Sequence, residues 1–201
     1  QDTKPRAQGG DNEIVLIASK SDRLFLEQTL SSMINDTLFT PQPEPYFKIV
    51  WIEPDRFNDV KRYVNVVVGA IGDYSSSKGT KLLKNILTEQ QYTSSMSGNN
   101  HLIFSKDVFA RDQNLLIING PSKDKIVEAS NDQGPWLKKQ FDDLFIFRQS
   151  SHLFEESTLQ VDLQASLSER YDWSIKIPWG YSVIRDSSDQ QFFWIGKELP
   201  F

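Results

Sequence analysis

The chain has 201 residues, a formal net charge of −5 and no cysteine. The acidic balance argues against nucleic acid as a partner, because nucleic-acid-binding domains usually carry a basic face. Without cysteine the chain forms neither disulfides nor thiolate metal sites, and a cysteine nucleophile is excluded. Its 13 Phe, 5 Trp and 6 Tyr supply many large apolar side chains, so a chain of this length can bury a substantial core.

The first twelve residues, QDTKPRAQGGDN, are polar and show no periodicity. This composition predicts a flexible N-terminal tether over residues 1–12, followed by a single domain over residues 13–201 that is either complete or the N-terminal part of a longer protein. A first residue other than Met indicates either removal of a signal segment or a trimmed piece of a cytosolic protein. We expect an extracytoplasmic location, periplasmic or anchored at the outer membrane, and no membrane-spanning segment.

Two continuous apolar runs predict strands that are covered on both faces. Residues 14–18 (IVLIA) form the first run, and residues 115–118 (LLII) form the second. Serine residues follow both runs and can cap helices, one over residues 21–36 and one after Ser122. The two strand–serine–helix units resemble each other, but βα units look alike generally, so this likeness does not establish an internal repeat.

The remaining segments alternate between strand and helix patterns and predict an α+β fold, in which helices pack on a mixed, mainly antiparallel sheet. Residues 92–100, rich in Ser, Asn and Gly, are expected to form a mobile loop. Three prolines predict an extended crossing segment at residues 40–45. The other expected strands are 46–52, 63–69, 102–104, 107–110, 174–177, 181–185 and 191–195, and the other expected helices are 54–62, 76–91, 135–149 and 157–171.

Histidine chemistry has little support in the sequence. His101 and His152 are the only histidines, and we interpret neither as part of a catalytic triad or a zinc site. Carboxylate-only sites for Ca²⁺ or Mg²⁺ need several oxygens from one loop, and the nearest candidate, residues 186–189, lacks the Gly and Glu of a calcium loop. We therefore expect no metal and no cofactor.

The turn at Gly120-Pro121-Ser122-Lys123 precedes an expected helix. Backbone N–H groups at such a position can hold an anion. The segment lacks the glycines and the Lys-Ser/Thr end of a phosphate-binding loop, so it also fits an ordinary strand-to-helix turn.

Two pairs of adjacent acids, Asp142-Asp143 and Glu155-Glu156, are candidates for glycoside hydrolysis. That chemistry needs two carboxyl groups that face each other across a cleft, roughly 5–9 Å apart. Adjacent acids on a helix point in different directions and are usually solvated, which is the alternative interpretation.

Four aromatic residues near the end of the chain form the best candidate for binding. Flat rings stack on sugars or hold hydrophobic peptides, whereas a Trp beside a Pro-Gly corner is also typical of the lid of a core. The four residues are Trp179, Tyr181, Phe193 and Trp194.

Several separated pieces share the order and spacing of one protein family. They are residues 41–47 (PQPEPYF), residues 62–68 (RYVNVVV), KDVFA with Gln113 and LLII in residues 106–118, and IPWGY with Phe193-Trp194 in residues 177–194. In these pieces the chain resembles an uncharacterised family of envelope proteins of Bacteroidota-type bacteria, often predicted lipoproteins, catalogued as a domain of unknown function.

The resemblance covers most of residues 13–195 and implies a secreted, membrane-anchored protein without an assigned activity. No catalytic residue is carried over from it. A lipoprotein is anchored through an acylated cysteine, so either that cysteine lies upstream of Gln1 or this member is not lipidated. Members of the family also continue well past the strand that holds Phe193 and Trp194.

Two functions from different classes stay open. The first is a non-enzymatic binding or assembly component of the cell envelope, whose partner is an envelope protein or a cell-wall polymer. The second is a hydrolase of envelope glycan or peptide that uses a carboxylate pair. We favour the first, because the sequence contains no Gly-x-Ser-x-Gly elbow and no recognisable catalytic residue.

Overall fold

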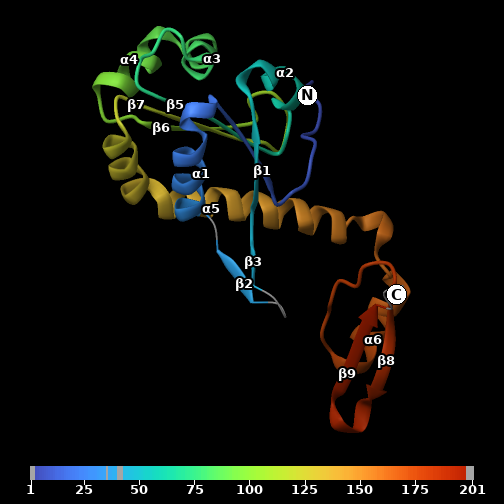
Figure 1. Cartoon of the computed structure of the whole chain (residues 1–201). Coiled ribbons are helices and arrows are strands. Elements are labelled where there is room, and N and C mark those ends of the chain that lie inside the picture. The colour runs from blue at the N-terminus through green and yellow to red at the C-terminus, as the bar shows by residue number, and fades with distance from the viewer. Residues whose placement is uncertain (1–2, 35, 40–42, 198–201) are drawn as a thin grey trace. The chain divides into compact units, whose positions relative to one another are not determined.

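The computed structural model describes residues 3–34, 36–39 and 43–197 (Figure 1). The chain forms two compact units, Gln1–Ile146 and Phe147–Phe201, where a single domain over residues 13–201 was expected. This division follows the packing of the apolar side chains. The described members of the three hydrophobic clusters all come from the first unit.

A five-stranded mixed sheet forms the centre of the first unit. Its strands are β1 (Glu13–Ala18), β4 (Lys48–Ile52), β5 (Asn65–Ile71), β6 (Leu102–Lys106) and β7 (Asn114–Gly120). The strand order is β4-β1-β5-β7-β6, with three parallel pairings and one antiparallel pairing between β6 and β7. The predicted α+β class with a mixed sheet is confirmed, and parallel pairing in this sheet is more extensive than the sequence suggested.

The interior strands carry the most buried side chains of the molecule. Every residue of β5 and β7 is buried, and so are the last five residues of β1. The four side chains of residues 115–118 are at most 4% exposed, which confirms the strand predicted there. Strands of a parallel sheet are apolar along their whole length because helices cover both faces.

Helices pack on both faces of this sheet (Figure 1). On one face, α1 (Lys20–Ile34) and α5 (Lys123–Leu153) share a cluster with Leu16, Val67 and Leu116. On the other face, Phe57, Leu83 and Tyr92 pack against Val15, Val66 and Ile117. These three side chains come from α2 (Phe57–Val60), α3 (Lys78–Ile86) and α4 (Glu89–Ser97), and η1 (Pro54–Arg56) precedes α2.

Two helices differ from the expected pattern. Helix α4 occupies most of residues 92–100, where a mobile loop was expected. Thr88 and Gln91 close a capping box at its start, and this local pairing stabilises the helix in spite of its polar composition. Helix α5 begins at Lys123 and continues through Pro135, so it is longer than the helix expected from residue 135, although Pro135 lacks the N–H that a helix interior uses.

Residues 107–110 form bends and no strand. The Gln113 side chain explains this difference, because its Oε1 accepts the N–H of Phe109 at 2.9 Å while the Gln113 N–H donates to Asp107 Oδ1 at 3.1 Å. Side-chain bonds of this kind compete with strand pairing. Strand β6 therefore ends at Lys106.

The N-terminal segment is attached to the first unit. The N–H of Ala7 donates to the Arg111 carbonyl at 2.9 Å, and the N–H of Val64 donates to the Gln8 carbonyl at 2.9 Å. The Ala7 side chain is buried against Val64 and Ala110. From residue 4 onward this differs from the flexible tether expected over residues 1–12, because the attachment uses backbone groups that composition does not reveal. Residues 1–2 lie outside the described residues.

Short antiparallel and helical elements complete the described chain. A small ribbon pairs β2 (Thr37–Phe39) with β3 (Pro43–Pro45); the rest of the extended segment expected at 40–45 and the helix end expected near Asn35 lie outside the described residues. The second unit holds α6 (Val161–Tyr171) and the predicted closing hairpin, whereas residues 174–177 are not a strand. Its other elements are η2 (Glu156–Thr158), β8 (Tyr181–Ser187), η3 (Ser188–Gln190) and β9 (Phe192–Lys197).

Candidate functional site

The strand order reverses direction at β1. The chain passes from β1 through α1 to β4 on one side of β1, and then returns to β5 on its other side. In open α/β sheets, ligands bind outside the carboxyl ends of the strands at such a switch point. Because β4, β1 and β5 are parallel, their carboxyl ends lie at one edge, and the three loops that leave them meet there.

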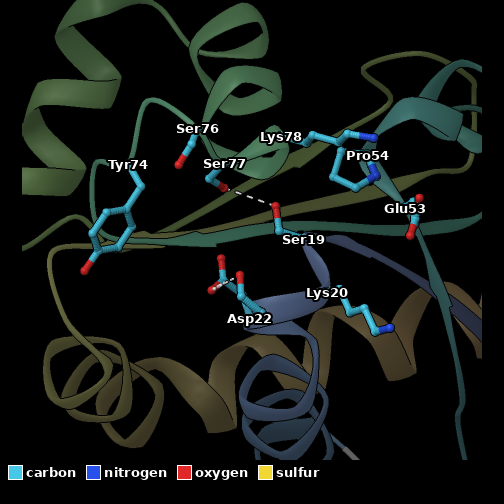
Figure 2. Close-up of a pocket in the computed structure, with 10 residues that line it drawn as sticks. Ser19, Lys20, Asp22, Glu53, Pro54, Tyr74, Ser76, Ser77 and Lys78 are labelled. Carbon is cyan, nitrogen blue, oxygen red and sulfur yellow. Dashed lines mark hydrogen bonds between the residues drawn. The ribbon is translucent and has the colours of Figure 1, made fainter.

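A pocket of about 540 Å³ opens at this edge (Figure 2). Residues 19–22 follow β1 and begin α1, Glu53 and Pro54 follow β4, and Tyr74 with residues 76–78 leads from β5 into α3. The volume lies in the range of small-molecule sites. We refer to it below as the switch-point pocket.

Two serines join the loops on the floor of the switch-point pocket. Ser19 Oγ accepts the N–H of Gly79 at 2.9 Å and lies 3.1 Å from Ser77 Oγ, and Figure 2 shows the two hydroxyls turned toward each other. Ser77 is the N-cap of α3, and its hydroxyl accepts the N–H of Thr80 at 3.2 Å. This contact fixes the start of α3 against the end of β1.

Gly79 allows this close approach. A Cβ atom at Gly79 would lie 3.2 Å from both the Gly69 carbonyl oxygen and Ser19 Oγ, which is tighter than ordinary van der Waals contact. A side chain here would push α3 away from the ends of β1 and β5. The glycine therefore belongs to the construction of the pocket.

The Asp22 carboxylate stands at the first turn of α1, on the opposite wall. Its Oδ2 accepts the N–H of Ile71 at 3.4 Å, and its Oδ1 accepts the Ser21 hydroxyl at 3.1 Å. A negative side chain is favourable at a helix start. Figure 2 shows that Asp22 points into the space between Ser19, Ser76 and Tyr74.

Tyr74 supplies an aromatic wall. Its side chain is 65% exposed, and its ring lies over Gly72, where a Cβ would come within 2.6 Å of the ring. Gly72 also has a positive φ of 73°, a conformation that favours glycine. The turn after β5 thus places an exposed flat ring beside the serine hydroxyls.

The charges around the switch-point pocket are balanced. Lys78 forms an ion pair with Asp55, and this hydrogen bond holds the pKa of Lys78 above its usual value. Lys20 and the carboxylates Asp22 and Glu53 also line the pocket. With positive and negative side chains together, the pocket does not have the cationic character that a site for a free phosphate would need.

The arrangement can therefore bind hydroxyl groups. Asp22 only accepts hydrogen bonds, and the serine hydroxyls donate or accept them. The N–H groups of Gly79 and Thr80 at the start of α3 already donate to the Ser19 and Ser77 hydroxyls, so the side chains supply the polar contacts. Tyr74 adds an apolar face.

A second polar network lies beside this site. Asp73 accepts hydrogen bonds from Lys84 Nζ at 2.7 Å and from the Tyr92 hydroxyl at 2.9 Å. The bond from Lys84, with that from Tyr92, lowers the pKa of Asp73, and burial together with the Asp73 contact raises the pKa of Tyr92. The network joins the loop after β5 to α3 and α4.

The two histidines belong to different units. His101 is buried in the first unit, and His152 is exposed near the end of α5. Glu155 and Glu156 follow His152 at spacings of three and four residues, but α5 ends at Leu153, so this spacing does not put them on one helix face. Within the described residues, no group of three His, Cys, Asp or Glu side chains could hold a metal ion.

The two pairs of adjacent acids do not form facing carboxylates. Asp142 and Asp143 accept from Lys138 and Lys139 respectively, one turn earlier on α5, at 2.6 and 2.7 Å. Glu155 and Glu156 are exposed. Asp143, Glu155 and Glu156 are therefore exposed acids, as the alternative interpretation has it, whereas Asp142 is half-buried and paired with Lys138.

The turn at residues 120–123 starts α5. The Ser122 hydroxyl accepts the N–H of Lys125 at 3.4 Å, and the Gly120 carbonyl accepts the N–H of Gly72 at 2.8 Å. Lys123 Nζ lies 5.3 Å from the centre of the Phe25 ring. These contacts match an ordinary strand-to-helix turn.

The aromatic candidates lie in the second unit. Trp179 is 74% exposed and Trp194 is 53% exposed, so neither covers a core, whereas Phe193 packs near Tyr171 and Trp173 with ring centres 6.0 and 6.3 Å away. The calcium candidate at residues 186–189 spans the end of β8 and the start of η3, and its first residue, Asp186, accepts hydrogen bonds from Arg170 and Tyr171.

The comparison with protein families decides the family of the chain. A model described as "Domain of unknown function (DUF8532)" matches residues 7–153. The chain belongs to the DUF8532 family. The prediction of a family catalogued as a domain of unknown function is thus confirmed, and the DUF8532 match contains every residue of the switch-point pocket.

No curated protein and no solved structure matches the chain. None of the described helices is both long and apolar enough to cross a membrane.

Sequence reasoning missed the switch-point pocket. Ser19 to Asp22 were interpreted as helix caps only, and residues 76–78 as the start of a helix. The available signal was that serines follow β1 at residue 19 and follow β5 at residues 75–77. Its meaning depends on β1 and β5 being parallel neighbours, which a mainly antiparallel sheet does not provide.

Proposed function

We propose that this DUF8532 protein is a non-enzymatic binding component that holds a saccharide unit of a bacterial cell-envelope polymer in the switch-point pocket. One observation carries the proposal: a pocket of small-molecule size stands where the strand order reverses, and it combines a carboxylate, serine hydroxyls and an exposed aromatic ring. Concave sites at switch points are where α/β proteins bind small molecules.

The side chains match the chemistry of a sugar. Each sugar hydroxyl donates one hydrogen bond and accepts others, so it needs both kinds of partner. Asp22 accepts, and Ser76 can donate or accept. The C–H face of a sugar ring is apolar and can lie on Tyr74.

An extracytoplasmic location is the second part of the proposal. It is supported by the resemblance to envelope proteins that are often predicted lipoproteins. A neutral polymer of the envelope suits the pocket better than a phosphate-rich one, because the lysines of the lining are balanced by Asp22 and Glu53.

Isothermal titration calorimetry with soluble mono- and oligosaccharides of bacterial cell walls tests the proposal. Saturable binding is expected to the full chain. Tyr74→Ala should weaken it roughly threefold to tenfold by removing the ring contact. Asp22→Asn should weaken it about tenfold or more, because hydrogen bonds to a charged acceptor are the stronger ones.

Two matched variants separate loss of binding from loss of fold. Asp124→Asn removes an acid from the first turn of α5, as Asp22→Asn does for α1, and Leu24→Ala truncates an exposed apolar side chain of α1. Both should bind like the original chain. Equal affinities for Tyr74→Ala, Asp22→Asn and the two controls would reject the site, and no binding to any saccharide would reject the ligand class.

A hydrolase is the second candidate, because Asp22 and Glu53 are two carboxylates that line one pocket. Glycoside hydrolysis uses such a pair as acid and base or nucleophile. The oligosaccharide that binds is incubated with the protein and then analysed by chromatography, which distinguishes binding from hydrolysis. Intact saccharide supports binding alone, and shorter products that disappear in Glu53→Gln support hydrolysis.

A further inference from the structure

A second pocket of about 350 Å³ lies near the carboxyl end of β7, between the segment that precedes β6 and the start of α5. Its lining includes His101, Lys125, Glu128 and Asp132. None of these residues contributes to the switch-point pocket. We call it the His101 pocket.

A hydrogen bond to the backbone of α4 fixes the imidazole of His101. Its side chain is 3% exposed, and Nδ1 lies 2.8 Å from the backbone carbonyl oxygen of Ser95. A carbonyl only accepts, so Nδ1 carries the proton and donates it. Ser95 is in the last turn of α4, where carbonyl groups lack partners inside the helix, which explains why the bond forms.

In the neutral imidazole, a proton on Nδ1 leaves a lone pair on Nε2. In neutral imidazole the second nitrogen is an acceptor when the first one is the donor. Among the described residues, none donates a hydrogen bond to Nε2, and the ring lines the His101 pocket. In the neutral ring, a side chain that lines the pocket therefore has an acceptor for which the described residues supply no donor.

The charged side chains of the His101 pocket include more hydrogen-bond acceptors than donors. Glu128 and Asp132 lie one helical turn apart on α5. Lys125 Nζ donates to Glu128 at 2.7 Å and compensates that charge. Asp132 forms no ion pair or hydrogen bond with another described residue. One lysine thus faces two carboxylates, and the pocket keeps a net negative charge.

We infer that the His101 pocket binds a primary ammonium group, which donates hydrogen bonds to His101 Nε2 and to the carboxylate of Asp132. An ammonium offers three N–H donors and a positive charge, and it finds acceptors and negative charge here. A metal ion is disfavoured, because no three His, Cys, Asp or Glu side chains of the described residues are placed to hold one.

The test compares two cations of equal charge. Methylammonium chloride is titrated into the isotopically labelled full chain while tetramethylammonium chloride is withdrawn, so that ionic strength stays constant. The long-range ¹H–¹⁵N spectrum of the imidazole is followed. With so few ligand atoms, the expected dissociation constant is on the order of 10 mM or weaker. A saturable shift of His101 Nε2 is expected with methylammonium alone, because tetramethylammonium has no N–H to donate.

Variants keep the result interpretable. Asp132→Asn removes an exposed charge and should weaken methylammonium binding about tenfold. Asp124→Asn, on the same helix outside the pocket, should leave it unchanged. His101→Asn retains an amide N–H for the Ser95 carbonyl but lacks Nε2, so it should stay folded and lose binding.

Three results would overturn the inference. They are a starting spectrum with the proton on Nε2, an equal response to both cations, or a methylammonium affinity that Asp132→Asn does not change. None of these results depends on whether the switch-point pocket binds a saccharide.

Discussion

The Leu116 side chain shows how much a single buried residue contributes to the stability of this fold. It lies on β7, is fully buried and belongs to the cluster that α1 and α5 cover. Leu116→Ala should lower the free energy of unfolding by about 2–5 kcal/mol, because the neighbours cannot fill the cavity completely. Urea unfolding measures this. Leu24→Ala on the exposed side of α1 is the control, with an expected change within about 0.5 kcal/mol. Similar losses for both variants would contradict the assigned central strand.

Residue-scale reasoning from sequence succeeded where chemistry is local. The run at residues 115–118 is apolar enough to specify burial, and Ser122 caps the following helix as predicted. It failed for Ser19 and Ser77, whose mutual contact spans 58 positions. No local pattern encodes that neighbourhood. The role of these serines follows from the order of the strands.

Between elements, the Asp73 network connects α3 and α4 to the loop after β5. Because the hydrogen bond from Lys84 lowers the pKa of Asp73 below its ordinary value of 3.8, the unfolded chain binds the proton more tightly. The stabilisation is therefore present above that value and is lost as the pH falls through the folded pKa. Asp73→Asn should be less stable than the original chain at pH 7, and the difference should shrink below about pH 4.

Chemical denaturation of both proteins between pH 3 and pH 7 measures this difference, with Asp124→Asn to report the loss of an exposed acid elsewhere. A difference that stays constant down to the lowest pH would contradict the role of Asp73.

Element-scale prediction from sequence was right for β1, β7 and the closing hairpin, whose apolar patterns are strong. It missed α4, whose polar sequence is stabilised by a capping box at Thr88 and Gln91. It also divided α5 into a helix after Ser122 and a helix from residue 135, because a proline inside a helix is unfavourable.

At the scale of the whole molecule, the division into two units has a direct consequence. The described hydrophobic clusters use side chains of the first unit alone. A chain that ends after Leu153 should therefore keep a cooperative thermal transition and the midpoint of the first unit. Circular dichroism and calorimetry of this chain and of the full chain measure it. Loss of cooperativity would show that residues 154–201 are needed for the first unit to fold.

The strand order was beyond reach from the sequence for a physical reason. Two strand–serine–helix units were recognised, yet βα units look alike whether their strands are neighbours or not. The covered strands favoured parallel pairing, whereas the paired strands late in the chain favoured antiparallel pairing. In the five-stranded sheet, β6 lies at the edge and pairs with β7 in the antiparallel direction. The other pairings of this sheet are parallel.

The proposed ligand site is the carboxyl edge of the sheet at β1 and β5. Backbone amide chemical-shift mapping of the full labelled chain, on addition of a soluble cell-wall oligosaccharide, tests it most directly. Saturable shifts are expected to concentrate at residues 19–22 and 72–79. Shifts concentrated instead around Trp179 and Trp194, or no saturable shift at the sheet edge, would contradict it.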